Sequence, residues 1–211
     1  MQMNERTDKL SDIYDIDKQL KKVLKKRRYR HSIGVRYTAI CLAMRYGEDL
    51  DKASYAGLLH DCAKYMSPAE LYQFAKEHDL PVSEYEKDNP GLLHGKCGAL
   101  LAEKEYGIKD HEILSAITYH TTGRPDMSPL EKIIFTADYI EPGRDEAPEL
   151  DMLRKTAFTD LDKAVYLISR QTLNYLRETG CVVDPATENT YNYYKKVYLS
   201  QNNSVVEEQL S

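Results

Sequence analysis

The stretch Gly57-Leu58-Leu59-His60-Asp61-Cys62-Ala63-Lys64 ends an apolar run with a histidine, an aspartate and, one turn later, a lysine. Consecutive residues of a helix point about 100° apart, so His60 and Asp61 can both lean toward one metal ion. His60 and Lys64 are four residues apart and share a helix face. An imidazole beside a carboxylate suits a borderline divalent cation such as Zn, Fe or Mn. Because the dipeptide is common, a half-buried histidine beside a solvated aspartate is the competing interpretation.

Two residues far from this stretch favour the metal. His31 lies upstream, and Asp138 interrupts the apolar residues of a helix expected over 130–140. A carboxylate without a partner among residues such as Ile133 and Phe135 is costly to bury, and a bound cation removes that cost. We therefore expect this helix to be deeply buried and Asp138 to bind a metal.

The ordered set His31, His60-Asp61 and Asp138 resembles the HD superfamily of metal-dependent phosphohydrolases, over about residues 28–144. Three segments are similar to its YqeK branch, namely Gly57 to Lys64, Leu92-Leu93-His94-Gly95 and Ala137-Asp138-Tyr139-Ile140-Glu141-Pro142-Gly143-Arg144. That branch hydrolyses diadenosine tetraphosphate symmetrically. The resemblance therefore implies a symmetrical bis(5'-nucleosyl)-tetraphosphatase that takes this dinucleotide as substrate and releases ADP.

The resemblance also implies which residues bind the metal, and these are His31, His60, Asp61 and Asp138. Such a set leaves positions open on an octahedral ion for a water and a phosphate oxygen. In some HD branches the residues equivalent to His94 and His120 bind a second metal that Asp61 bridges; in the YqeK-like interpretation they contact phosphate or act as acids. The resemblance implies iron as the native metal, but the ligand types do not exclude Mn, Zn or Mg.

The expected catalytic residues are Asp61, Lys64, His94 and His120. These four are also expected to bind substrate, and the remaining substrate contacts are Arg28, Thr121, Arg144 and the turn Cys181, Val182, Val183, Asp184, Pro185 and Ala186. Arg28 precedes His31 by three residues and so projects from the same helix face. The turn at 181–186 rests on the resemblance alone. Because the chain has no Walker-type glycine loop, side chains and metal must hold the phosphates.

The mechanism that these residues predict is metal-assisted hydrolysis of a phosphoanhydride. The cation lowers the pKa of a bound water, so that hydroxide is available near neutral pH. Lys64 and Arg144 offset the charge of the polyphosphate. A protonated His120 or His94 donates a hydrogen bond to the leaving diphosphate, and Thr121 donates beside His120.

Composition places the chain among ordinary cytoplasmic globular proteins. Its 211 residues are 42% hydrophobic and 30% charged, and a net charge of −5 makes nucleic acid an unlikely partner. The four cysteines form no C-x-x-C pair, which is typical of reduced thiols. No apolar run reaches the roughly 20 residues that cross a bilayer, so we expect no membrane association. A homodimer stays open.

The hydrophobic periodicity predicts a single all-α domain of roughly eight helices over residues 14–200. Residues 1–13 are expected to be a flexible N-terminus, and residues 201–211 a polar, disordered tail. Ser67-Pro68-Ala69-Glu70 and Ser128-Pro129-Leu130-Glu131 carry the signature of a helix start. Residues 79–90, with two prolines, predict a loop.

Two other functions compete with the main one. The first is an HD phosphohydrolase that acts on a nucleoside monophosphate, a deoxynucleotide or a cyclic dinucleotide. The second is a non-catalytic nucleotide- or RNA-binding protein that uses the seven basic residues within 21–30. Such a run is usually a solvated face, although its end beside His31 is well placed to bind phosphate.

Overall fold

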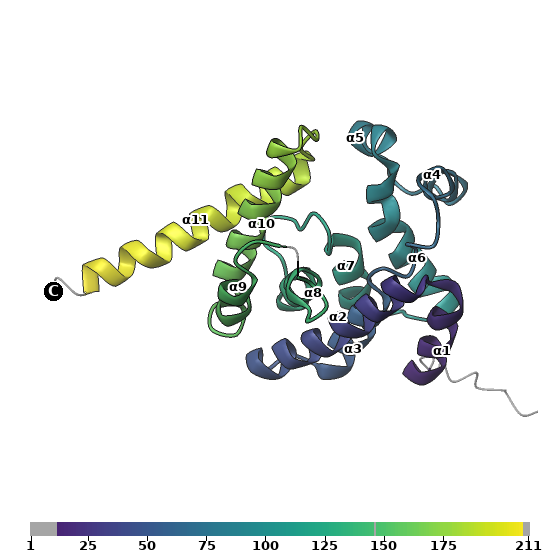
Figure 1. Ribbon diagram of the computed structural model, residues 1–211, viewed down its shortest axis with the longest axis horizontal. Coiled ribbons are helices and arrows are strands. Elements are labelled where there is room, and N and C mark those ends of the chain that lie inside the picture. The colour runs from purple at the N-terminus through teal and green to yellow at the C-terminus, as the bar shows by residue number, and fades with distance from the viewer. Residues whose placement is uncertain (1–11, 146, 209–211) are drawn as a thin grey trace, which may run out of the picture.

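The computed structural model describes residues 12–145 and 147–208, with side chains described up to residue 200. These residues contain eleven α-helices, one 3-10 helix (η1) and no strand, so the predicted all-α fold is confirmed (Figure 1). The elements are α1 (Ile13–Val23), α2 (Lys26–Tyr46), α3 (Leu50–Leu59), α4 (Pro68–Glu77), α5 (Glu84–Asp88), η1 (Pro90–Leu93), α6 (His94–Tyr106), α7 (His111–Tyr119), α8 (Pro129–Ile140), α9 (Leu150–Ala157), α10 (Leu161–Glu178) and α11 (Pro185–Glu208).

The prediction of roughly eight helices is too low because short helices and breaks escape hydrophobic periodicity. Helix α1 ends at Val23, and after a short break α2 begins at Lys26 and carries both Arg28 and His31. The expected loop at 79–90 contains α5, which a capping box between Ser83 and Glu86 starts. Another break separates α9 from α10, where the Asp160 side chain accepts a hydrogen bond from the Lys163 amide.

The capping boxes predicted at Ser67 and Ser128 are both present. In each, the serine hydroxyl accepts from the amide three residues on, and the glutamate there accepts from the serine amide. These reciprocal bonds satisfy two amides that the helix leaves free. The second box fixes the start of α8, which carries Asp138.

Helices α2, α3, α7 and α8 meet at the centre of the molecule, with α4, α5 and α6 on one side and α9 and α10 on the other (Figure 1). The approach of α3 to α2 depends on Gly57, since a Cβ there would lie 2.9 Å from the Cα of Arg36. This contact brings the C-terminal end of α3, and with it His60, against the face of α2 that carries His31.

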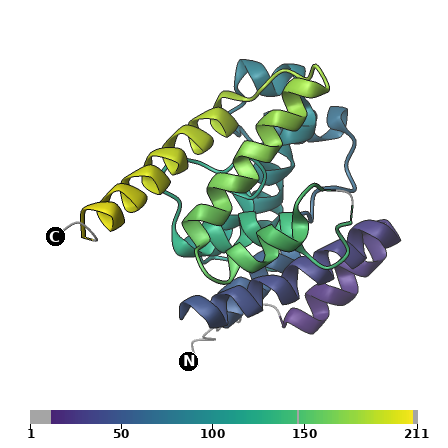
Figure 2. The same cartoon turned by 60° about the vertical axis from the view of Figure 1, so that its left-hand side comes forward.

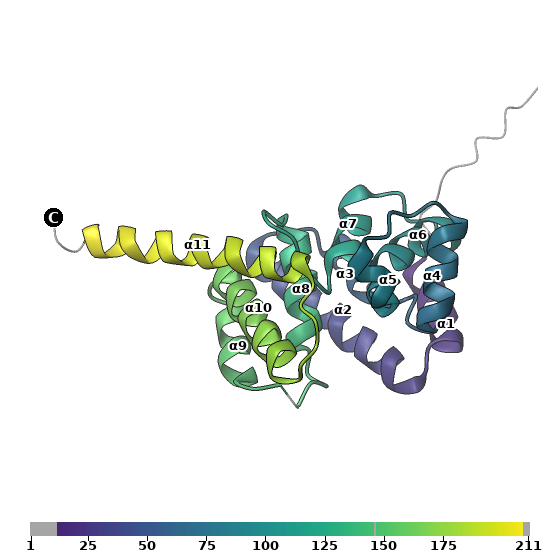
Figure 3. The ribbon, with the colours of Figure 1, turned by 90° about the horizontal axis from the view of Figure 1, so that it is seen from above.

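Helix α11 lies along α10 over its first half and then projects from the body (Figures 2 and 3). Its Tyr194 packs in the core, 2% exposed, where the phenol accepts from the Met127 amide. The helix continues to Glu208, past residue 200, where the sequence ended the domain. Residues 1–11 of the expected N-terminus and 209–211 of the expected tail lie outside the described residues. No helix in the described part of the chain is both long and apolar enough to cross a membrane.

Candidate metal centre

Asp61 stands at the centre of the candidate site, in the turn that follows α3. Its carboxylate is 2% exposed, and each of its oxygens faces a different set of side chains. Oδ2 lies 3.4 Å from His60 Nε2 and 3.8 Å from His31 Nε2. Oδ1 lies 3.6 Å from His94 Nε2 and 3.5 Å from His120 Nε2. One carboxylate is therefore shared between two pairs of histidines.

The side chains on the Oδ2 side, His31, His60 and Asp138, are called the His31 group here. They come from α2, the C-terminal end of α3 and the last turn of α8. His31 Nε2 lies 2.8 Å from Asp138 Oδ1 and 3.3 Å from His60 Nε2. The structure thus brings together all four residues that the sequence assigned to the first metal.

The side chains on the Oδ1 side, His94, His120 and Thr121, are called the His94 group. His94 begins α6, and His120 and Thr121 follow α7. The Nε2 atoms of the two histidines are 3.1 Å apart, and Thr121 Oγ1 lies 2.9 and 3.0 Å from them. The residues expected to bind a second metal or phosphate therefore form a second, adjoining cluster.

Three of the histidines are oriented in the same way by their own chain. Nδ1 of His60, His94 and His120 lies 2.6–2.8 Å from the carbonyl oxygen three residues earlier. A carbonyl only accepts, so each Nδ1 carries a proton and donates it, and each Nε2 is left directed at the cluster. Fixing the tautomer through the other ring nitrogen is how proteins prepare a histidine to bind a metal.

His31 is oriented by Glu141, a residue that the sequence analysis missed. His31 Nδ1 donates to Glu141 Oε1 over 3.1 Å, and the Gly143 amide donates to Glu141 Oε2 over 2.6 Å. Gly34 makes room for this carboxylate, because a Cβ there would lie 2.2 Å from Glu141 Oε2. Glu141 follows Asp138 by three residues, and that spacing was the available signal.

The donor set fits a divalent cation. Asp61 Oδ1 is buried without a hydrogen-bond partner among the described residues, which is costly for a carboxylate oxygen. The Thr121 hydroxyl has one proton, so it can donate to only one of the two Nε2 atoms beside it. Two groups of residues could each hold a metal ion, because the ligand atoms within each group lie no more than 4.8 Å apart. These groups are His31-His60-Asp61 and Asp61-His94-His120. Imidazole and carboxylate together suit Fe, Mn or Zn.

The HD domain model matches residues 28–143, which is more than half of the chain. The chain belongs to the HD-domain family. This HD-domain protein is 42% identical to a symmetrical bis(5'-nucleosyl)-tetraphosphatase of Bacillus subtilis over 174 residues, 82% of this chain and 92% of that one. It is 43% identical to the protein of the same name from Staphylococcus aureus over 178 residues, 82% of this chain and 90% of that one.

A solved structure has the same fold as this HD-domain protein. It is described as a predicted HD superfamily hydrolase involved in NAD metabolism from Clostridium acetobutylicum. The TM-score is 0.86 at 40% sequence identity, and the match covers 89% of this chain and 99% of that chain. The resemblance stated from the sequence is confirmed.

The ionisable groups of the cluster shift the pKa values of one another. Burial opposes ionisation of Asp61, but His60 and His120 outweigh it and hold the pKa of Asp61 well below its usual range. The pKa of Asp138 is lowered by His31 and His60 against the effect of burial. Burial acts to lower the pKa of His31, yet Asp138 and Glu141 raise it overall.

His94 behaves differently from His31. Burial, helped by His120 and Lys64, lowers the pKa of His94 to about 3. The imidazole is therefore neutral near pH 7, which is the form that binds a metal. A neutral imidazole whose Nδ1 proton is engaged by the Gly91 carbonyl has no proton to give to a leaving group.

The three basic side chains expected to bind phosphate, those of Arg28, Lys64 and Arg144, lie around Asp61 and Asp138. Arg28 donates to Asp61 Oδ2 over 2.6 Å, and Arg144 donates to Asp138 Oδ1 over 3.1 Å. The Lys64 ammonium has no hydrogen-bond or ion-pair partner within the described chain. Its pKa is lowered by partial desolvation and by the positive charge of Arg28 and Arg144.

The helix that carries Asp138 is buried, as expected. The Asp138 side chain at its end is 21% exposed and pairs with Arg144. His31 and Arg144 pair with the Asp138 carboxylate there, so it is not isolated among apolar residues. The argument for metal binding therefore rests on Asp61 Oδ1.

The turn at 181–186 is the part of the expected site that lies apart from the cluster. No hydrogen bond or ion pair joins it to the metal-ligand candidates within residues 12–145 and 147–200. Tyr85 of α5 donates its hydroxyl to the Val182 carbonyl. Thr190 of α11 donates to the Thr122 carbonyl over 2.9 Å, which ties the start of α11 to the turn that carries Thr121.

Proposed function

We propose that this protein hydrolyses diadenosine tetraphosphate symmetrically to two ADP, using a divalent cation. The observation that carries the proposal is the shared carboxylate of Asp61, whose two oxygens face two histidine pairs. Its Oδ1 is buried and has no hydrogen-bond partner among the residues that the structure describes. The substrate is supported by relatives at 42–43% identity that bear the name of this activity.

The His31 group with Asp61 supplies two imidazoles and two carboxylates, which we propose as the first metal site. His94 and His120, together with Asp61, are proposed as a second. A divalent cation bound in this cluster would supply positive charge to a phosphoryl oxygen and lower the pKa of water at the site. Iron is proposed as the native metal, and the ligand types fit Mn or Zn as well.

Three cations of the chain are proposed to bind the polyphosphate. Arg28 and Arg144 are 39% and 44% exposed, so each can turn from its carboxylate toward a phosphate. The guanidinium fork matches two phosphate oxygens at once. Lys64, which forms no ion pair within the described residues, is suited to donate to the diphosphate that leaves.

His120 and Thr121 are proposed to orient the chain of phosphates on the Oδ1 side. The Ile117 carbonyl holds the His120 ring, so its Nε2 stays directed at the cluster. Arg124 pairs with the buried Glu131 over 2.8 Å and holds the turn that follows Thr121. The turn at 181–186 is proposed to contact a nucleoside, since Thr190 connects the start of α11 to this turn.

Product analysis tests the proposal. The purified protein, loaded with Fe(II), Mn(II) or Mg(II), is incubated with diadenosine tetraphosphate, and the nucleotides are separated by ion-exchange chromatography. ADP as the sole product is the expected result. AMP plus ATP would contradict symmetrical cleavage, and no turnover with any metal would contradict the substrate. A panel of nucleoside monophosphates, deoxynucleotides and cyclic dinucleotides then tests the alternative HD activity.

A further inference from the structure

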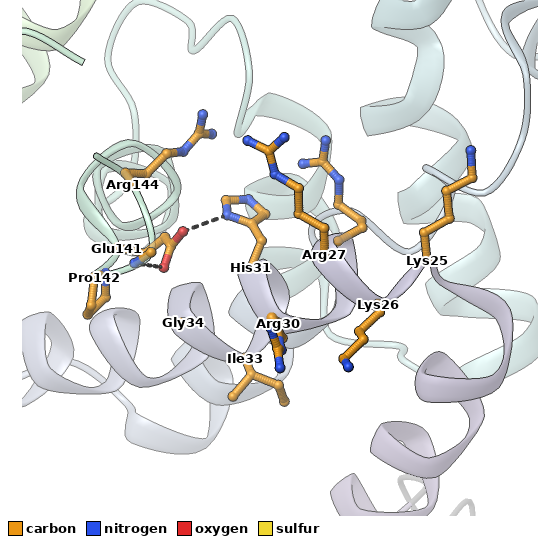
Figure 4. A pocket seen from close by; sticks show the side chains of 12 residues that line it. Lys25, Lys26, Arg27, Arg30, His31, Ile33, Gly34, Glu141, Pro142 and Arg144 are labelled. Carbon is orange, nitrogen blue, oxygen red and sulfur yellow. Dashed lines mark hydrogen bonds and ion pairs between the residues drawn. The ribbon is translucent and has the colours of Figure 1, made fainter. Parts of the chain in front are cut away.

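A basic cavity lies beside the His31 group. Its volume is about 1070 Å³, and it runs between the first turns of α2 and the segment that follows α8 (Figure 4). His31, Gly34, Glu141 and Arg144 are among the residues that line it. Ligand pockets commonly measure about 300–1,000 Å³, so the cavity is large enough for a nucleotide.

The lining of this cavity carries surplus positive charge. Six of its residues are basic, namely Lys25, Lys26, Arg27, Arg28, Arg30 and Arg144. The acidic residue of the lining is Glu141, whose oxygens are engaged by His31 and the Gly143 amide. Within the described part of the chain, the side chains of Lys25 and Arg27 form no ion pair or hydrogen bond. Such a surface suits a ligand that carries phosphates.

Arg27 is the member of this set best placed beside the metal cluster. It precedes His31 by one helical turn, and residues four apart share a helix face. Figure 4 shows its side chain on the same side of α2 as His31, whereas Lys26 and Arg30 leave from the other side. Arg27 is exposed, so its substitution does not disturb the core.

The proposed substrate, when bound, must extend from the cluster in two directions. Symmetrical cleavage breaks the central phosphoanhydride, so an identical nucleoside diphosphate arm extends from each side of the reacting bond. Asp61 Oδ1 faces the His94 group, and from there Thr122 leads to α11. Asp61 Oδ2 faces Arg28 and His31, and from there the basic cavity begins.

We infer that the basic cavity holds one nucleoside diphosphate arm of the substrate and that Arg27 binds the phosphates of that arm. The inference rests on the proposed function and adds a second nucleotide subsite to it. The other arm extends across the His94 group toward α11. Two chemically identical arms therefore meet different surfaces of one chain.

Steady-state kinetics of the metal-loaded Arg27→Gln variant test the inference. A charged contact to substrate that persists in the transition state changes KM and leaves kcat alone. We expect KM for diadenosine tetraphosphate to rise about tenfold, with kcat within about twofold of wild type. Lys22→Gln on α1 removes the same charge outside the cavity and should behave as wild type. Arg27→Lys should restore part of the affinity.

The number of ADP molecules bound per chain gives an independent readout. Equilibrium dialysis of the metal-loaded protein with ADP should find two sites in wild type, of which Arg27→Gln weakens one. A single site in wild type, or a KM of Arg27→Gln equal to that of Lys22→Gln, would overturn the inference. Wild type that makes no ADP from the dinucleotide fails the proposed function instead.

Discussion

The two sides of Asp61 differ in charge more than in residue type. The His31 group contains a second carboxylate, Asp138, and is bordered by Arg28, Arg144 and Glu141. The His94 group has no carboxylate of its own, and its two imidazoles are held by backbone carbonyls. Both sides use imidazole Nε2 atoms and the same aspartate.

From this difference we expect the two proposed metal sites to bind a cation with different strength. Carboxylates add charge to a metal site, whereas neutral imidazoles add only lone pairs. The His31 group should therefore bind its cation more tightly, and the His94 group should depend more on Asp61. The open basic cavity also lies on the His31 side, so charge and access coincide there.

The largest effect is expected from Asp61→Asn, which removes the charge that both sides share. We expect kcat to fall on the order of a thousandfold and the bound metal to fall on both sides. Steady-state assays and metal analysis by mass spectrometry measure the two effects. Asp51→Asn, in the exposed first turn of α3, is the control. Full activity with full metal content in Asp61→Asn would refute the shared-carboxylate site.

Glu141→Gln sharpens the comparison, because Glu141 supports the His31 group alone. An amide accepts the His31 proton more weakly, and losing such a partner typically weakens metal binding about 10–100-fold. Competition with a chelator should show the loss for one class of site. Glu105→Gln, exposed on α6, should match wild type. Equal weakening of every bound metal would mean that the two sides are not independent.

The smallest effect concerns the stability of the metal-free protein between pH 6.5 and 5. The pKa of His94 is about 3 in the folded protein and 6.5 for a free histidine. As the pH falls below 6.5, the unfolded chain therefore takes up the proton first, and the free energy of unfolding decreases. This costs about 2 kcal/mol by pH 5. His31 acts in a separate window, because the stability that its raised pKa contributes is present below pH 6.5 and is lost as the pH rises above that value.

Urea unfolding of the chelated protein at pH 6.5 and 5 measures this loss. His94→Gln removes the titrating group and should flatten the dependence in that interval. His78→Gln is a matched control, since His78 lies near Lys104, away from the cluster. A variant as pH-sensitive as wild type would assign the acid loss to other groups.

The sequence predicted the helical class and the residues around Asp61 because those depend on local patterns. Serine, proline and glutamate start helices wherever they recur, and both predicted capping boxes formed. The HD pattern brought His31, His60, Asp61 and Asp138 together as predicted. The short α5 was missed because five residues show no periodicity.

Contacts between distant segments were beyond sequence reasoning. Glu141 supports His31 across 110 positions, and its residue type alone does not distinguish it from a solvated glutamate. The exposure of Asp138 depends on where α8 ends relative to α2, which periodicity does not give. The basic run at 21–30 was divided by the break after Leu24, which places Arg27 and Arg28 on the helix of His31.

The three histidines held by carbonyls of their own helix ends would link the stability of the protein to the proposed metal. Helices α2, α3, α6, α7 and α8 bring their ligands together only when the chain is folded. A cation that binds the native state alone stabilises it by mass action, by about 2.7 kcal/mol at a hundredfold excess over its Kd. Cells short of the metal would then lose the protein to proteolysis as well as its activity, so its abundance would report metal supply.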